Sequence, residues 1–175
     1  MTEQAFDSAR FRQVLGHFPT GVCVVAGFHE DKPVGLAIGS FFSISLDPPL
    51  VGFCAGRTSL TWPKLQEAGS FCINILAEDQ EDVSRVFAST EADKFAGLGW
   101  DHSPLGSPRI TGALAWIDCR LDAVHPAGDH DIAVGAVHDL RVAREGSPLV
   151  FFRGGYGVWS GPPAVDVRTS RWHPT

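Results

Sequence analysis

The segment Gly128-Asp129-His130 joins residue types that can bind or orient a ligand. An imidazole can donate or accept hydrogen bonds near neutral pH, and a neighbouring carboxylate can fix its tautomer. Pro126 and Ala127 precede the segment and, together with Gly128, predict a hairpin turn. We therefore expect the ring of His130 to be exposed at a hairpin and to face a bound molecule.

Two other roles for His130 stay open on the sequence alone. His125 and His130 have the chemistry of metal ligands, but a metal site needs three or four converging ligands, so we expect none. A structural histidine at the start of a strand is the second alternative.

Three further segments have the composition of a cofactor cleft. Pro19-Thr20-Gly21 is a turn whose backbone N–H groups and hydroxyl can meet a ligand. Gly35 and Gly39 lie inside one strand-like run, which predicts close approach of something flat, with a β-bulge or barrel corner as the alternative. Residues 54–61 end a buried run and open a helix, which predicts an anion seat, with ordinary helix capping as the alternative.

Composition limits the partners. The 175 residues carry a net charge of −6, which argues against nucleic acid and against an anionic membrane surface. The sequence has no run of about 18 apolar residues and no apolar signal region near its start, so we expect a cytoplasmic protein. It also lacks the GxGxxG and GxxxxGK[ST] nucleotide loops and the HExxH and GxSxG motifs.

The four cysteines each lie singly in an apolar run, and no CxxC pair occurs. A thiol in such a run packs as a small hydrophobic group, so we expect buried, inessential cysteines. Cys54 is the one to watch, because it falls in the third cleft segment.

The order of elements predicts a mainly β protein with peripheral helices. Apolar residues spaced at i, i+3, i+4 and i+7 predict a helix over 11–18. Two short helices are expected after Thr61-Trp62-Pro63 and after Asp79. The strand-like runs are Val22–Phe28, Val34–Leu46, Leu50–Ala55, Phe71–Leu76, Leu114–Val124, Ile132–Val142 and Leu149–Phe152. Because they cluster without regular intervening helices, a closed or nearly closed antiparallel barrel fits best.

Two of these runs alternate with period two, as half-buried antiparallel strands do. Apolar residues at 115, 117, 119 and 121 alternate with Trp116, Asp118 and Arg120.

Residues 88–112 carry charge, Gly and Pro and are interpreted as a long excursion between elements. We divide the chain into a domain over 1–160 and a Pro-rich tail over 161–175.

Several stretches together resemble the flavin reductase family, the reductase components of two-component flavin-dependent monooxygenases. They are Phe18-Pro19-Thr20-Gly21-Val22, the run from Ser40 to Leu50, Phe71–Leu76, Gly112–Ala115, Gly128-Asp129-His130 and Arg153-Gly154-Gly155-Tyr156. Their order and spacing are specific, and the resemblance runs from about Phe11 to Trp159.

The resemblance implies an FMN-binding split β-barrel of six strands, antiparallel and Greek-key-like. It also implies a homodimer, a flavin (FMN or FAD), a reduced nicotinamide (NADH or NADPH, with a mild preference for NADH) and delivery of reduced flavin to a partner monooxygenase. We expect Trp62, Trp100 and Trp159 to form part of the apolar surface that a second subunit covers.

Family contacts to the cofactors would fall on matching positions of this chain. The flavin contacts would be Thr20, Gly21, Ala37, Ile38, Gly39, Ser40, Cys54, Ala55, Ser59 and Thr61. Ser84, Arg85 and Phe87 would reach the phosphate side, and Gly128, Asp129, His130, Gly155 and Tyr156 would lie on the nicotinamide side. His130 would position the nicotinamide, and backbone N–H groups near Cys54 would stabilise reduced flavin.

One departure from the family bears on retention of the flavin. Many relatives carry Thr-Ala-Asn-Ser where this chain has Ala37-Ile38-Gly39-Ser40, so two polar side chains are missing.

Two alternative functions stay open. One is another split-barrel flavin oxidase, which acts on pyridoxamine phosphate or uses a deazaflavin. The other is a flavin-binding protein without turnover.

Overall fold

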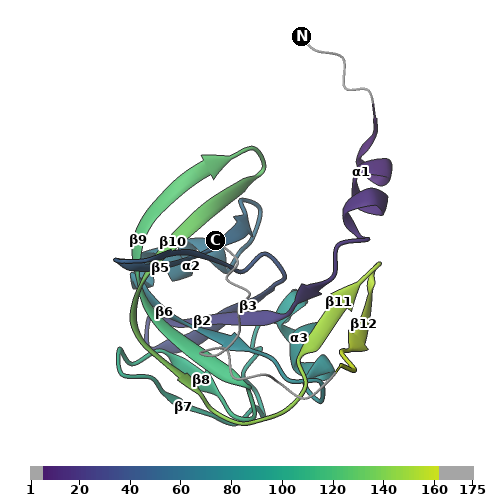
Figure 1. Cartoon of the computed structure of the whole chain (residues 1–175). Helices are drawn as coiled ribbons and strands as arrows, with labels where there is room; N and C mark the ends of the chain where they lie inside the picture. The colour runs from purple at the N-terminus through teal and green to yellow at the C-terminus, as the bar shows by residue number, and fades with distance from the viewer. Residues whose placement is uncertain (1–5, 162–175) are drawn as a thin grey trace.

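The computed structural model describes residues 6–161 and is dominated by one strongly curved antiparallel sheet (Figure 1). Its strand order is β3-β2-β6-β9-β10-β5-β4. The bounds are β2 Cys23–His29, β3 Lys32–Ile38, β4 Phe42–Leu46, β5 Pro49–Gly56, β6 Ser70–Ile75, β9 Ala115–Ala127 and β10 His130–Val142. The predicted mainly β, antiparallel barrel is confirmed.

The centre of the sheet is buried on both faces. In β2, Val25 packs with Phe53 and Phe71 inside the barrel, whereas Val24 packs with Phe87 and other residues of an outer cluster. A strand with apolar side chains on both faces reads as a continuous apolar run. This explains why Val22–Phe28 shows no alternation.

One predicted strand is wrong. The run Val34–Leu46 forms two strands, β3 and β4, which lie at opposite ends of the sheet order. The chain leaves β3 after Ile38 and enters β4 at Phe42, so residues 39–41 form the corner. This break gives the main sheet seven strands in place of the expected six. The barrel-corner interpretation of the second glycine, Gly39, is therefore correct.

Smaller elements surround the barrel. A three-stranded sheet contains β1 Thr20–Gly21, β11 Leu149–Phe152 and β12 Gly155–Val158, and a hairpin contains β7 Trp100–His102 and β8 Pro108–Ile110. The helices are α1 Ser8–Leu15, α2 Trp62–Ala68 and α3 Glu81–Ala88. All three predicted helices are present, although α1 begins and ends three residues before the predicted 11–18.

Helix α1 differs from the others because none of its residues is buried. It stands away from the barrel in Figure 1, with its apolar residues Phe11, Val14 and Leu15 exposed. Trp62, in contrast, is only 2% exposed, which corrects the expectation that it forms an outer apolar surface. It packs in the barrel core against Phe53.

For two residues of β9, the burial predicted from the alternating pattern is wrong. Trp116 and Asp118 were expected on the polar side but are buried. The β7–β8 segment covers them: Asp118 accepts hydrogen bonds from the Ser103 hydroxyl (2.7 Å) and the Leu105 N–H (2.6 Å). The predicted excursion over 88–112 is thus part of the packed structure.

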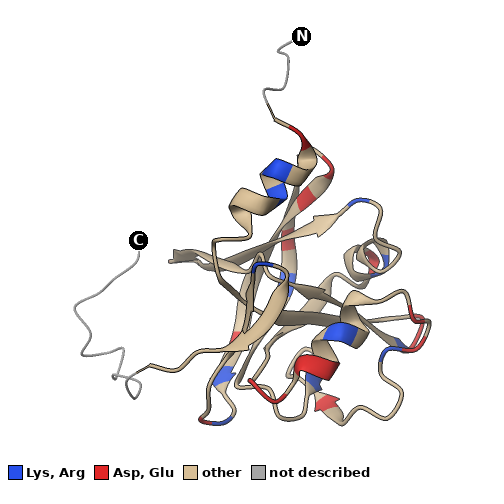
Figure 2. Cartoon of the chain, turned by 90° about the vertical axis from the view of Figure 1, so that its right-hand side faces the viewer, with Lys and Arg blue, Asp and Glu red and all other residues tan. Residues whose placement is uncertain are grey.

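Charges of both signs are interspersed over the face seen in Figure 2. Within residues 6–161, no helix has the length and apolarity needed to cross a membrane. The proposed tail over 161–175 lies outside the described residues except for Gly161.

Candidate functional site

A cavity of about 950 Å³ opens where the ends of several elements meet. Its wall along β3 runs from Pro33 to Ser40, and the end of β5 contributes Cys54, Ala55 and Gly56. The segment before α2 adds hydroxyls, and the first turn of α2 adds Lys64. The end of α3 and the following residues add Phe87 to Ala92 and Lys94, and the start of β10 adds His130. Backbone, hydroxyl and cationic groups therefore surround one space.

The two glycines of the β3 region are explained by the chain itself. A Cβ on Gly35 would lie 2.7 Å from the Phe87 ring, and one on Gly39 would lie 2.8 Å from the Thr20 hydroxyl. Both distances are shorter than a normal contact, so a side chain at either position requires a shift. Close packing by Phe87 and Thr20 is thus one reason for glycine at these two positions of the cavity wall.

A serine hydroxyl joins the barrel corner to β5. The Ser40 hydroxyl accepts a hydrogen bond from the Cys54 N–H (2.9 Å) and donates one to the Cys54 carbonyl (3.1 Å). Because the Cys54 N–H is bonded to Ser40, it is not itself free to stabilise a reduced flavin. That role stays a prediction for the other backbone N–H groups near Cys54 and Ala55. Ser40 instead holds the corner and the strand end together at the cavity wall.

The four thiols differ in accessibility. Cys54 is partly exposed at the cavity, whereas the other three are buried. Burial raises the pKa of the Cys23 and Cys119 thiols to about 12 and also raises the pKa of Cys72. These three thiols behave as hydrophobic core groups.

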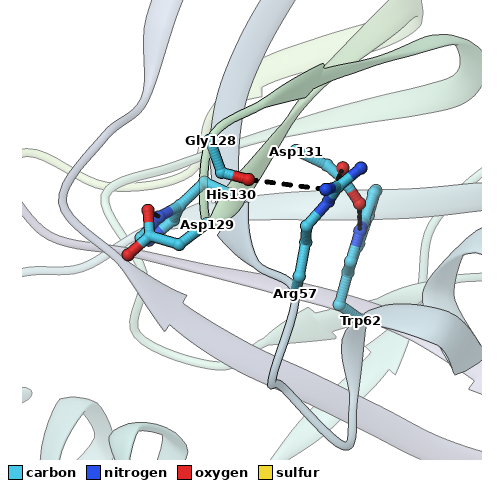
Figure 3. A network of polar contacts seen from close by, with 6 residues as sticks. All are labelled: Arg57, Trp62, Gly128, Asp129, His130 and Asp131. Atoms are coloured by element: carbon cyan, nitrogen blue, oxygen red, sulfur yellow. Dashed lines mark hydrogen bonds and ion pairs between the residues drawn. The ribbon is translucent and has the colours of Figure 1, made fainter. Parts of the chain in front are cut away.

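The hairpin between β9 and β10 carries His130 to the cavity (Figure 3). Gly128 and Asp129 form the turn, which begins two residues after the predicted start at Pro126 because β9 continues to Ala127, and Gly128 has a φ of +67°. The His130 Nδ1 lies 2.7 Å from the Asp129 carboxylate, and that contact lowers the pKa of Asp129. The pairing of His130 with Gly56 brings the ring to the end of β5.

Asp131 fastens the same hairpin to the segment before α2 (Figure 3). Its two carboxylate oxygens accept hydrogen bonds from the Trp62 indole N–H (3.0 Å) and the Arg57 Nε (2.8 Å). These bonds, the Trp62 bond first, lower the pKa of Asp131. The Arg57 N–H also donates to the Asp129 carbonyl (3.0 Å). The wall that carries His130 is therefore cross-linked to the neighbouring wall.

The α3 wall has a different arrangement from the one the sequence suggested. Ser84 is buried, and its hydroxyl lies 2.8 Å from the Tyr156 hydroxyl. Arg85 stacks over the Tyr156 ring and pairs with Glu81. None of Ser84, Arg85 and Tyr156 lines the cavity, whereas Phe87 does.

The cavity thus brings together about half of the expected site residues. Those that line it are Ala37, Ile38, Gly39, Ser40, Cys54, Ala55, Ser59, Thr61, Phe87 and His130. Those that do not are Thr20, Gly21, Ser84, Arg85, Gly128, Asp129, Gly155 and Tyr156. Thr20 still contacts this region through Gly39.

Sequence reasoning missed two lysines of the cavity, Lys64 and Lys94. Lys94 follows α3 within the segment predicted to be an excursion. The nearby hydroxyl residues Ser89 and Thr90 were the only local indication that this segment could line a ligand site. Within residues 6–161, no cluster of three or more His, Cys, Asp or Glu side chains could hold a metal ion.

Comparisons with known proteins agree on one family. A family model described as "Flavin reductase like domain" matches residues 15–160. A flavin reductase of Pseudomonas putida is 51% identical over 158 residues, which cover 90% of this chain and 93% of that protein. The reductase subunit HsaB of a flavin-dependent monooxygenase from Rhodococcus jostii is 50% identical over 153 residues, which cover 87% and 78%.

Solved structures are similar as well. Nitrilotriacetate monooxygenase component B from Mycobacterium thermoresistibile has a TM-score of 0.86 to this chain and is 44% identical. The match covers 97% of this chain and 98% of that one.

Proposed function

Since this chain belongs to the flavin reductase family, we propose that it transfers a hydride from a reduced nicotinamide to a flavin and supplies the reduced flavin to a partner monooxygenase. The observation that carries this proposal is the cavity with His130 on one wall and the ends of β3 and β5 beside it.

The residues present fit such cofactors. The cavity offers a strand backbone and small side chains along β3, hydroxyls at Ser59 and Thr61, and lysines for an anionic tail. The nicotinamide supplies the hydride and the flavin accepts it, so the protein needs no covalent chemistry of its own. Its task is to hold the two rings together, and His130 serves by positioning the nicotinamide.

We favour NADH as the hydride donor and leave the flavin as FMN or FAD. The relative SmoA of Agrobacterium fabrum, 43% identical, is named an FMN reductase (NADH). SgcE6 of Streptomyces globisporus, an NADH:FAD oxidoreductase solved in complex with NAD and FAD fragments, is 33% identical with a TM-score of 0.82.

The test is steady-state oxidation of NADH and of NADPH with FMN, FAD and riboflavin in turn. We expect turnover with at least one nicotinamide–flavin pair. A flavin-binding protein without enzymatic activity would bind flavin yet oxidise neither nicotinamide. That outcome would reject the proposal.

The flavin is proposed to act as a co-substrate that exchanges freely. The support is the absence of polar side chains at Ala37 and Gly39, both at the cavity. Purified protein should lose flavin on dialysis and regain activity when free flavin is added. Stoichiometric flavin after extensive dialysis, with no response to added flavin, would exclude this behaviour.

A homodimer is proposed because α1 leaves apolar surface without cover in a single chain. Phe11, Val14 and Leu15 are each at least half exposed, and Phe18 is 75% exposed. An isolated helix of eight residues is marginal in water, so a second surface is needed to stabilise it. Sedimentation should give a dimer at micromolar concentration. A stable, fully active monomer would contradict this.

A further inference from the structure

A second, smaller cavity lies away from the one that His130 lines. It is formed by β7, β8, the turn after β8, the start of β9 and the end of β10, and it shares no lining residue with the larger cavity. In Figure 1, β7 and β8 lie at the opposite end of the barrel from the β9–β10 turn. The volume of this second cavity is about 220 Å³. Pockets for drug-sized ligands measure about 300–1,000 Å³, so only a small molecule fits here.

One arginine of the second cavity already has an anionic partner. Arg109 on β8 donates from Nε and from one terminal nitrogen to the two carboxylate oxygens of Asp101, both at 2.7 Å. This pairing lowers the pKa of Asp101, so its carboxylate stays ionised. The Arg109 guanidinium also lies over the Trp116 ring, 4.8 Å from the ring centroid. The charges of Arg109 and Asp101 therefore neutralise each other at the wall.

The other arginine of the second cavity, Arg141, has no such partner. It lies near the end of β10, directly opposite Trp116 of β9, so the two side chains share one face of the sheet. The Arg141 side chain is exposed and lines the cavity. No ion pair within residues 6–161 includes it. Since two arginines and one carboxylate line the cavity, one positive charge is left for a ligand.

The rest of the lining indicates which anion fits. Ile110, Ala113 and Trp116 are buried and give the second cavity an apolar floor. The planar guanidinium of Arg141 matches the two oxygens of a carboxylate, and the hydroxyl of Thr111 in the same lining can donate a further hydrogen bond. A phosphate would leave further charged oxygens facing the apolar floor without donors, which is unfavourable. A small organic acid, with one carboxylate and a short apolar body, is therefore the best match.

The walls of the second cavity are held by contacts with the residues that precede α3. The Gln80 side chain donates to the Thr111 carbonyl (3.0 Å). Arg144, which follows the lining residue Ala143, pairs with Asp79. A site that is already held in place loses less conformational freedom when a ligand binds.

We propose that the second cavity binds a small organic carboxylate, with the Arg141 guanidinium as its anchor and the floor around Trp116 as the contact for its apolar part. Nothing in the flavin reductase function uses these residues. The site is the same whether or not the larger cavity holds a flavin.

The experiment is an NMR titration that follows the indole N–H signal of Trp116, assigned with Trp116→Phe. The probe is benzoate, and benzamide is the uncharged molecule of the same shape. We expect benzoate to shift this signal with a dissociation constant on the order of 1 mM or lower. Benzamide should bind about tenfold more weakly or worse, because it cannot form charge-assisted bonds with Arg141. Saturating FMN, which would occupy the larger cavity, should leave the benzoate titration unchanged.

Three variants test which charges act. Arg141→Gln should weaken benzoate binding about tenfold or more. Its matched control is Arg120→Gln, because Arg120 is an exposed arginine of β9 that lines neither cavity, and this variant should bind as the wild type does. Asp101→Asn should have the opposite effect and tighten benzoate binding about threefold or more, because it removes the anion that neutralises Arg109.

Several results would overturn the proposal. They are equal affinity for benzoate and benzamide, displacement of benzoate by FMN, and unchanged benzoate binding in Arg141→Gln. If Arg141→Gln does not fold, the salt dependence of the wild type decides. Added salt should weaken benzoate binding and leave benzamide unaffected, since screening acts on the charge alone. Identical salt dependence of the two probes would reject the site.

Discussion

The two walls that flank the cavity use their charged residues in opposite ways. On the hairpin wall, Asp131 binds Arg57 and Trp62, and this contact holds His130 beside the cavity. On the α3 wall, Arg85 pairs with Glu81, whereas Lys94 meets only carbonyls. A cationic side chain that is close in sequence to a cofactor motif can therefore be paired with a carboxylate of the same protein. A carboxylate pairs with Arg85, whereas the hydrogen bonds of the Lys94 ammonium go to backbone carbonyls.

The largest effect is expected from Asp131→Ala on the hairpin wall. The variant leaves the buried Trp62 indole N–H without its acceptor, at a cost of about 1–3 kcal/mol, and releases Arg57. We expect kcat/KM for NADH to fall roughly 10–100-fold and the melting temperature to drop.

Asp129→Ala is the matched control for that variant. The Asp129 side chain is 94% exposed, and its one side-chain ion pair among residues 6–161 is with the His130 ring. Solvent screens such an exposed pair, so we expect at most about a fivefold effect on kcat/KM. Equal losses for Asp129→Ala and Asp131→Ala would show that the Asp131 contact has no special role in positioning His130.

His130→Ala tests the same wall at the ring itself. A lost hydrogen bond to the nicotinamide costs about 0.5–1.5 kcal/mol, and more if a buried group is left unpaired. We expect KM for NADH to rise, or kcat/KM to fall, by roughly 3–100-fold, with much less change in flavin affinity. Separate titrations of NADH and flavin, with a melting curve, decide the question. Unchanged NADH kinetics in a folded variant would remove His130 from the site.

Tyr156→Phe tests whether the α3 wall contributes to stability rather than to kinetics. It leaves the hydroxyl of the buried Ser84 without its partner, so the free energy of unfolding should fall by about 1–3 kcal/mol. Chemical denaturation measures this loss. NADH kinetics should stay near wild type, because neither residue lines the cavity. The double variant Tyr156→Phe, Ser84→Ala should be less destabilised than the sum of the two single variants, because no hydroxyl is left unpaired. Strictly additive losses in the free energy of unfolding would show that the two hydroxyls are not coupled.

The smallest effect is expected from Cys54→Ser. Turnover should persist, since nothing in the proposed function requires a thiol, and complete loss of turnover in a folded variant would restore thiol chemistry to the mechanism. In the native protein at pH 8, a thiol reagent should modify Cys54 first. Cys23, Cys72 and Cys119 are buried and should react only after unfolding.

Most of the fold was predictable because apolar runs and turn residues mark strand ends locally. The predicted Leu50–Ala55 became β5, Pro49–Gly56, with one additional residue at each end. The corner at residues 39–41 was only an alternative at the sequence level, because strand-like residues continue on both sides of it. Its bend depends on a bond from Ser40 to Cys54, a residue distant in sequence.

The candidate site was predictable only where one segment decides a residue's position. Ser40, Cys54 and His130 lie at strand ends and line the cavity as expected. The position of the Arg85 side chain depends on which face of α3 packs against the sheet. The position of Lys94 depends on the course of a loop, which only tertiary contacts determine. Local pattern carries no information about either.

The position of β3 at one end of the main sheet has a consequence for handling the protein. Among residues 6–161, β3 pairs with β2 alone, and its residues from Pro33 onward line the cavity. An open strand edge is a template for pairing with another chain, and proline near its start gives only partial protection because it removes one donor. Pro33 is such a residue. A bound cofactor would cover this edge, so preparations without flavin should aggregate sooner on storage than preparations kept with it.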